Sequence, residues 1–161
     1  MLDHEYQRMY EVEDQYWWFV SRRRLVLELM ADRIPTPSEG RGRPVILDVG
    51  CGTGANAEAM VGLGRVIGAD LSPLALARCQ RRSLHELVQA KAESVPLKSG
   101  SVDWIVATDI LEHLDDDRAA LREFRRLLRP GGRALITVPA YRSLWSEHDE
   151  ALMHRRRYVK H

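Results

Sequence analysis

Short apolar segments alternate with segments of helical periodicity over most of the chain. Five apolar runs predict strands, at residues 44–49, 65–69, 87–91, 103–108 and 133–138. Helices are predicted between them, at residues 55–63, from residue 72 onward and at residues 115–128. Strands that alternate with helices form parallel βαβ units with right-handed crossovers. The sequence therefore predicts an α/β fold that is Rossmann-like and doubly wound around a mainly parallel sheet.

Two of the predicted helices carry clear local signals. Ser72 is a suitable N-cap, and Pro73 suits the first helical position after it. In the helix at 115–128 one face is apolar, and Pro130-Gly131-Gly132 is expected to end that helix. The apolar face is formed by Ala120, Phe124 and Leu127.

The first part of the chain has a different pattern. Residues 5–34 are predicted to be helical, because Trp18, Arg22, Leu25 and Leu29 recur at three- and four-residue steps. Residues 35–44 collect proline, glycine and charge, which is typical of a linker. We expect one domain over 1–161, with a helical cap and linker at 1–43, a core at 44–140 and a tail at 141–161.

Composition narrows the classes of function. The chain has 161 residues, of which 45% are hydrophobic and 29% charged, as in ordinary globular domains. A formal net charge of +1 argues against nucleic acid as the main partner. No apolar run is long enough to span a bilayer, and two cysteines are too few for a disulfide framework. We expect a cytoplasmic protein with reduced thiols.

The strongest chemical signal follows the first predicted strand. Glycines at positions 50, 52 and 54 allow a sharp turn and a close approach of ligand to backbone. Their GxGxG spacing differs from the GxGxxG of dinucleotide-binding proteins. Asp48 would repel a pyrophosphate but suits a cationic ligand. The alternative is a structural turn in which Asp48 caps nearby backbone. Cys51 is expected to be a packing residue beside the ligand.

The run from Leu47 to Gly54, LDVGCGTG, resembles the first motif of class I S-adenosylmethionine (SAM)-dependent methyltransferases. It is similar to the small-molecule enzymes of ubiquinone and menaquinone biosynthesis. The resemblance implies SAM as cofactor and S-adenosylhomocysteine as product. It also implies that Gly50, Gly52 and Gly54 line the methionine end of SAM and that Asp48 contributes directly or through water.

Further cofactor residues follow the second and third strands. Asp70 lies about twenty residues after the first glycine, where a carboxylate accepts hydrogen bonds from the ribose hydroxyls. The alternative is a solvated aspartate at a strand end. Leu71 is expected to form an apolar contact with the adenine ring. Lys91 stands where the resemblance implies an aspartate for the adenine amine, so backbone groups of Ala92 and Glu93 are expected to replace it.

After the fourth strand, the segment Asp109-Ile-Leu-Glu112-His113 resembles the part of the family that lies under the sulfonium and the acceptor. The resemblance implies cofactor contacts from Asp109 and Leu111. His113 is the candidate general base, which is needed only for a weakly acidic acceptor such as a hydroxyl. The alternative is that His113 packs against the cofactor or caps a helix. Glu112 is expected to organise the loop through backbone hydrogen bonds.

The two ends of the chain hold candidate substrate residues. Trp18 and Arg22 are expected to form a lid, unless the aromatic residues pack on the domain instead. Tyr141, His148 and His154 follow the fifth strand, where the family varies with substrate. Arginines 155–157 suggest an anionic or sugar- or lipid-linked acceptor. No metal is expected, because two histidines lack a third ligand.

The resemblance covers residues 44–140 and five of the family's usual seven strands. Residues 128–138 are therefore expected to form an exposed sheet edge, which either a longer chain or a second copy covers. The leading hypothesis is methyl transfer to a small molecule, at an unspecified oxygen, nitrogen or carbon atom. The alternatives are a SAM-binding module without transferase activity and a nicotinamide-dependent oxidoreductase.

Overall fold

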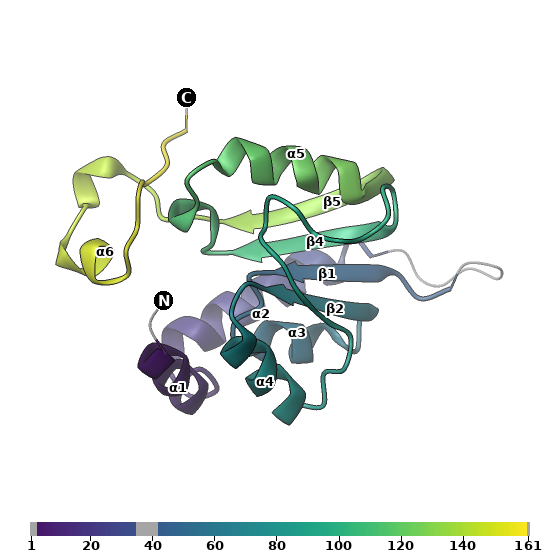
Figure 1. The fold of residues 1–161 in the computed structure, drawn as a ribbon, viewed down its shortest axis with the longest axis horizontal. Helices are drawn as coiled ribbons and strands as arrows, with labels where there is room; N and C mark the ends of the chain where they lie inside the picture. Colours follow the sequence, from purple (N-terminus) through teal and green to yellow (C-terminus); the bar gives the residue numbers. More distant parts are fainter. Residues whose placement is uncertain (1–2, 35–41, 161) are drawn as a thin grey trace.

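Five parallel strands form a single sheet in the computed structural model, which describes residues 3–34 and 42–160 (Figure 1). The strands are β1 (Val45–Val49), β2 (Arg65–Asp70), β3 (Leu87–Gln89), β4 (Val102–Thr108) and β5 (Leu128–Thr137). Their order across the sheet is β3-β2-β1-β4-β5, and every neighbouring pair is parallel. The predicted Rossmann-like α/β fold is confirmed.

Helices cover both faces of this sheet. α3 (Ala55–Met60) and α4 (Pro73–Arg81) connect the first three strands, and α5 (Asp117–Leu127) precedes β5. The predicted start of α4 is confirmed, because the Ser72 side chain accepts a hydrogen bond from the amide of Ala75 at 3.4 Å. None of the described helices is both long enough and apolar enough to cross a membrane.

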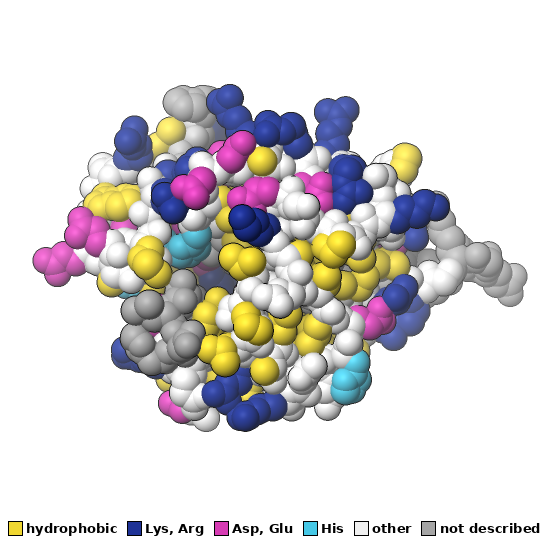
Figure 2. All heavy atoms as spheres, viewed as in Figure 1, with side chains coloured by type: hydrophobic (Ala, Val, Ile, Leu, Met, Phe, Trp, Pro, Cys, Tyr) yellow, Lys and Arg dark blue, Asp and Glu magenta, His cyan; other side chains and the backbone are white. Residues whose placement is uncertain are grey.

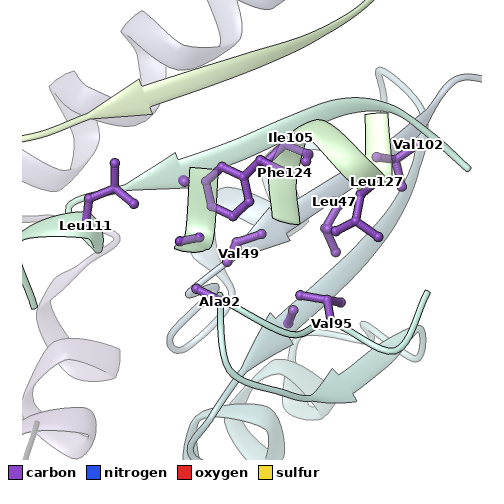
Figure 3. Close-up of a cluster of buried hydrophobic side chains, with 12 residues drawn as sticks. Leu47, Val49, Ala92, Val95, Val102, Ile105, Leu111, Phe124 and Leu127 are labelled. Carbon is purple, nitrogen blue, oxygen red and sulfur yellow. The ribbon is translucent and has the colours of Figure 1, made fainter. Parts of the chain in front are cut away.

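The apolar face predicted for α5 is confirmed, since Ala120, Phe124 and Leu127 are buried. They pack against side chains of β1 and β4 in the cluster shown in Figure 3. The predicted helix end is wrong: α5 stops at Leu127, and Pro130-Gly131-Gly132 lies within β5. The pairing register of β4 and β5 shifts between Val102 and Trp104, which accommodates this irregular start of the strand.

The N-terminal segment forms two helices rather than one. α1 (Asp3–Val12) and α2 (Trp17–Ala31) are separated by a turn around Glu13. The side of α2 that packs on the sheet carries Val26 and Met30, which contact Ile46 of β1. The spacing of Trp18, Leu25 and Leu29 correctly predicted a helix over this stretch, but these three side chains are 50%, 50% and 38% exposed and do not form its packing face. Most of the predicted linker lies outside the described residues.

β5 forms one edge of the sheet and pairs only with β4 within the described residues. Hollows flank it on both faces, one beside Leu121 and Ile136 and the other beside Leu29 and Leu135. The expected exposed edge is therefore present. Beyond β5, the tail contains η2 (Arg142–Leu144) and α6 (Glu147–Ala151) and lies near the carboxyl ends of the strands (Figure 1).

Candidate functional site

The chain order across the sheet reverses between β1 and β4, because β1 leads outward to β2 whereas β4 leads outward to β5. Ligands of open α/β sheets bind outside the carboxyl ends of the strands at such a switch point. The glycine loop follows β1 at this place. Gly50, Gly52 and Gly54 have φ angles of 69°, 54° and 93°, which glycine adopts without strain.

Asp48 lies at the end of β1, directly behind the glycine loop. The residue is 1% exposed, and its Oδ2 atom has no hydrogen-bond partner among the described residues. Burial, followed by the charge of Asp70, raises the pKa of Asp48 to about 7, whereas Arg22 lowers it. A buried carboxylate without a partner is unfavourable. Asp48 is therefore suited to pair with a cationic group of a ligand.

Asp70 ends β2 beside the same loop. Its Oδ2 accepts a hydrogen bond from the amide of Gly52 at 2.9 Å, and its Oδ1 accepts one from the amide of Ser72 at 2.8 Å. Burial raises the pKa of this carboxyl, and the two amides oppose the shift. The reading of Asp70 as a solvated aspartate is therefore wrong. Leu71, which follows it, is 59% exposed and available to a planar ligand.

The turn after β3 holds the residues predicted near the adenine. Lys91 is exposed, and its backbone pairs with Ser94 in a short bridge. Ala92 is buried in the main core cluster, and Glu93 is partly exposed. Ala92 thus fixes the turn to the core, and the adenine contacts expected from the backbone of Ala92 and Glu93 stay a prediction.

Helix α1 lies over the glycine loop. The methyl group of Met9 reaches within 2.9 Å of the place where a β-carbon on Gly52 would lie. Tyr6 lies close enough to Asp70 for that charge, after burial, to raise the pKa of its phenol. Cys51 packs against Cys79, with 3.8 Å between the sulfur atoms, in agreement with the packing role predicted for it.

A buried ionic group attaches α1 and α2 to the loop, and the sequence pattern did not indicate it. Glu13 is 6% exposed, and its carboxylate accepts hydrogen bonds from the Thr53 hydroxyl and, at 2.9 Å, from Arg82. Arg82 also lies over the Tyr10 ring, 5.1 Å from its centroid. An acidic residue among polar neighbours is expected to be exposed to solvent. The sequence around Glu13 therefore gave no sign that this residue is buried.

Arg22 of α2 lies among carboxylates at the carboxyl edge of the sheet. Its guanidinium donates a hydrogen bond to Asp109, whose other oxygen accepts one from the Thr137 hydroxyl at 2.8 Å. The Arg22 Nε atom is buried and has no partner among the described residues. Burial lowers the pKa of Arg22, and the charges of Asp48 and Glu112 oppose that shift. The structure thus places Arg22 beside the cofactor residues, with its charge already paired.

The aromatic residues at the start of α2 are largely exposed. Trp17 is 64% and Trp18 is 50% exposed, and the two rings contact each other edge to face at 5.7 Å. Trp17 and Trp18 therefore pack on the domain only in part. Their role as a lid stays a prediction.

The segment after β4 contains η1 (Leu111–His113). Leu111 is 4% exposed and belongs to the main core cluster, so it holds this segment in place. Glu112 is fully buried, and neither carboxylate oxygen has a hydrogen-bond partner in the described part of the chain. The predicted bonding of this side chain to the backbone of the loop stays a prediction. Burial raises the pKa of Glu112 to about 7.

His113 lies beside the C-terminal tail and contacts one of its side chains. Its ring is 4.8 Å from the ring of His154, measured between centroids. Burial, followed by the charge of His154, lowers the pKa of His113 to about 4. The imidazole is therefore neutral at pH 7 and can accept a proton or coordinate a cation, but such a low pKa makes it a weak base.

The tail is attached to this segment by its arginines. Arg157 binds the fully buried Asp149 through two contacts of 2.7 and 2.8 Å, and Arg155 donates its amide to the Glu112 carbonyl at 2.8 Å. Arg156 donates to the carbonyl of Leu114 at 2.8 Å. The arginine run thus forms contacts within the chain. Tyr141 and His148, which were predicted near the substrate, are exposed.

Comparison with known proteins agrees with this geometry. Residues 47–136 match the family of methyltransferase domains. The demethylmenaquinone methyltransferase of Chlorobaculum tepidum is 34% identical over 130 residues, which are 78% of this chain and 50% of that protein. A probable SAM-dependent methyltransferase of Mycolicibacterium smegmatis is 33% identical over 129 residues, covering 79% of this chain and 47% of that protein.

A solved structure has the same fold. The YcgJ protein of Bacillus subtilis is 28% identical, superimposes with a TM-score of 0.65, and covers 81% of this chain and 61% of its own. The chain spans half or less of the length of the curated relatives it matches. The matched residues contain the glycine loop, Asp70 and η1. The chain therefore belongs to the methyltransferase domain family, whose cofactor is S-adenosylmethionine.

Proposed function

We propose that this protein transfers the methyl group of SAM to a small-molecule acceptor. One observation carries the proposal: Asp48 is buried, its Oδ2 atom has no hydrogen-bond partner among the described residues, and it lies directly behind a GxGxG loop at the switch point of the sheet. SAM presents an ammonium and a sulfonium and no phosphate, so an anionic recess suits it. The same carboxylate opposes a nicotinamide dinucleotide, whose pyrophosphate it would repel.

SAM brings a methyl group that is already activated by the positive sulfur. The residues of this chain therefore have to bind and orient SAM and the acceptor and to exclude water from the site. The glycine loop is the part of the chain that would bind the methionine end of SAM. Asp70 faces the ribose, where a carboxylate can accept hydrogen bonds from two hydroxyls. α1 covers the loop, with Met9 against Gly52, and keeps water from this side.

A small molecule suits the charge distribution better than a nucleic acid. The formal net charge is +1, and the arginines of the tail bind carboxylates and carbonyls of the chain itself. On the face drawn in Figure 2, Lys and Arg side chains are interspersed with Asp and Glu and form no continuous basic stripe. Nucleic-acid binding surfaces carry such a stripe.

Asp70→Ala is expected to weaken SAM binding by about 1 to 3 kcal/mol, because hydrogen bonds from the ribose to a charged acceptor are lost. Calorimetric titration of SAM and S-adenosylhomocysteine into wild type and variant measures this. Since Asp70 also binds the Gly52 amide, a thermal unfolding curve must show that the variant is folded. Unchanged SAM affinity in a folded variant, or binding of a nicotinamide cofactor in place of SAM, contradicts the proposal.

The raised pKa of Asp48 predicts that SAM binding releases a proton. Asp48 is mostly neutral below its pKa of about 7, and a bound cation favours the ionised form. SAM affinity is therefore expected to rise with pH between about pH 5 and 8. Titrations at pH 6 in buffers of different ionisation enthalpy count the released protons.

Asp48→Asn is the matched control for this measurement, because it keeps the shape and removes the titration. Its binding is expected to release no proton through this site. S-adenosylhomocysteine keeps the ammonium and lacks the sulfonium, so equal proton release with both ligands assigns Asp48 to the ammonium. Equal proton release from wild type and Asp48→Asn would show that Asp48 does not face the cofactor.

A further inference from the structure

Three potential metal ligands meet where η1 contacts the tail. Glu112, His113 and His154 each offer one donor atom, and these atoms lie within 4.8 Å of one another. Glu112 and His113 come from η1, whereas His154 follows α6. The two imidazole rings are nearly perpendicular, with 79° between their planes. Two nitrogens and one carboxylate oxygen are therefore gathered in one place.

The Glu112 side chain is the strongest indication that a ligand binds here. It is 0% exposed, and both of its oxygens are buried without a hydrogen-bond partner among residues 3–34 and 42–160. Buried carboxylates in native proteins are hydrogen-bonded, paired with a charge or bound to a metal. The guanidinium of Arg22 is nearby but donates its hydrogen bond to Asp109. A cation bound between Glu112 and the histidines would satisfy the carboxylate.

His154 is oriented as metal-binding histidines are. Its Nδ1 atom lies 2.9 Å from Oδ1 of Asp149, which leaves Nε2 free. Asp149 is itself buried and held by Arg157 and by the amide of Ser146 at 2.9 Å. A carboxylate that fixes the second nitrogen of a ligating histidine is the usual outer contact of a metal site. His154 is therefore held in place before an ion arrives.

We propose that Glu112, His113 and His154 bind one divalent transition-metal ion. Two imidazoles and one carboxylate suit Zn²⁺ and its neighbours in the first row, and three protein ligands leave at least one position open. The site lies beyond the carboxyl end of β4, in the segment that follows this strand. If the proposed function holds, the open position is available to an oxygen atom of the acceptor.

The sequence alone pointed away from this site, because the two histidines of the tail, His148 and His154, lacked a third ligand. The structure leaves His148 exposed and brings His154 to His113 instead. His148 is therefore a suitable control: it lies in the same tail, is a histidine and is outside the cluster. His85 is a second exposed histidine, far from the tail in the sequence.

Titration with Co²⁺ tests the site, because the visible spectrum reports nitrogen coordination and competition with a chromophoric chelator for Zn²⁺ gives the affinity. We expect one ion per chain for wild type, His148→Gln and His85→Gln. Glu112→Gln, His113→Gln and His154→Gln are each expected to weaken Zn²⁺ binding by at least the loss seen when an outer contact is removed, about 10- to 100-fold.

Asp149→Asn provides the second readout, because it leaves all three ligands in place and alters the outer contact to His154. It also changes the bonds that Asp149 accepts from Arg157 and Ser146, so its fold has to be checked with particular care. In a folded variant, Zn²⁺ binding is expected to weaken by about 10- to 100-fold. Circular dichroism has to show that each variant is folded. The proposal is overturned if wild type binds no ion, if folded ligand variants bind as tightly as wild type, or if His148→Gln loses as much affinity as His154→Gln. SAM titration of the same samples tests the proposed function separately.

Discussion

Arg82→Ala is expected to lower the free energy of unfolding by about 3 to 5 kcal/mol, because it leaves the buried Glu13 without its cation. The Arg82 side chain is 8% exposed and donates to Glu13 at 2.9 Å, to Asp14 at 2.7 Å and to Glu58 at 2.6 Å. Its loss also removes the contact with the Tyr10 ring. Chemical denaturation at pH 7 measures the change.

Arg65→Ala is the matched control for this loss. Arg65 forms an ion pair with Glu86, and the two side chains are 58% and 44% exposed. Removing an exposed pair is expected to change stability by at most about 1 kcal/mol. If Arg82→Ala loses no more than Arg65→Ala, the buried group contributes nothing beyond a surface pair.

A double variant tests whether the loss of stability comes from the unpaired buried charge rather than from the loss of the ion pair itself. Glu13→Leu combined with Arg82→Met removes both charges, so no unpaired charge is left inside the protein. Replacement of a buried ion pair by apolar residues is often neutral or stabilising. We therefore expect the double variant to recover most of the stability that Arg82→Ala loses. Because Glu13 also binds Thr53 of the glycine loop, SAM affinity reports whether the loop keeps its position.

Gly50→Ala is expected to destabilise the protein by about 2 to 5 kcal/mol and to impair SAM binding. The φ angle of 69° costs an alanine about 1 to 2 kcal/mol. A β-carbon at this position would also overlap the side chain of Ile110, and overpacking of this kind costs about 1 to 3 kcal/mol more. Denaturation and calorimetry on the same sample give the two effects.

Gly100→Ala isolates the backbone contribution. Gly100 has a φ angle of 61°, but no described atom lies within 4 Å of the place of its β-carbon. This variant is expected to lose only about 1 to 2 kcal/mol and to bind SAM as wild type does. Equal losses in Gly50→Ala and Gly100→Ala would mean that Ile110 moves away without cost and that contact at the loop is unimportant.

The order of strands and helices could be predicted because its signals are local. An apolar run such as the one in β1 and a cap such as Ser72 act within a few residues, and the structure confirms both. The end of α5 was harder to predict. Pro130 and the glycines after it are strong breakers of helices, but β5 tolerates them at its exposed start, where β4 has shifted register.

The N-terminal helices show where periodicity is insufficient. Trp18, Leu25 and Leu29 lie at helical spacing, yet Val26 and Met30 are the residues buried against the sheet. Two neighbouring apolar stripes were available, and the shape of the sheet surface selected one of them. The break at Glu13 arises in the same way, since it depends on Arg82 and Thr53, far along the chain.

The sequence by itself determined the family, the glycine loop and the acidic residues at the ends of β1 and β2. These depend on strand ends and turns, whose chemistry lies in consecutive residues. Only the tertiary structure decided that Oδ2 of Asp48 and both oxygens of Glu112 are buried with no hydrogen-bond partner in the described part of the chain, and that His154 meets His113. The burial, the pairing and the pKa of these side chains depend on which distant segments come into contact. Those contacts form only when the sheet, the N-terminal helices and the tail pack together.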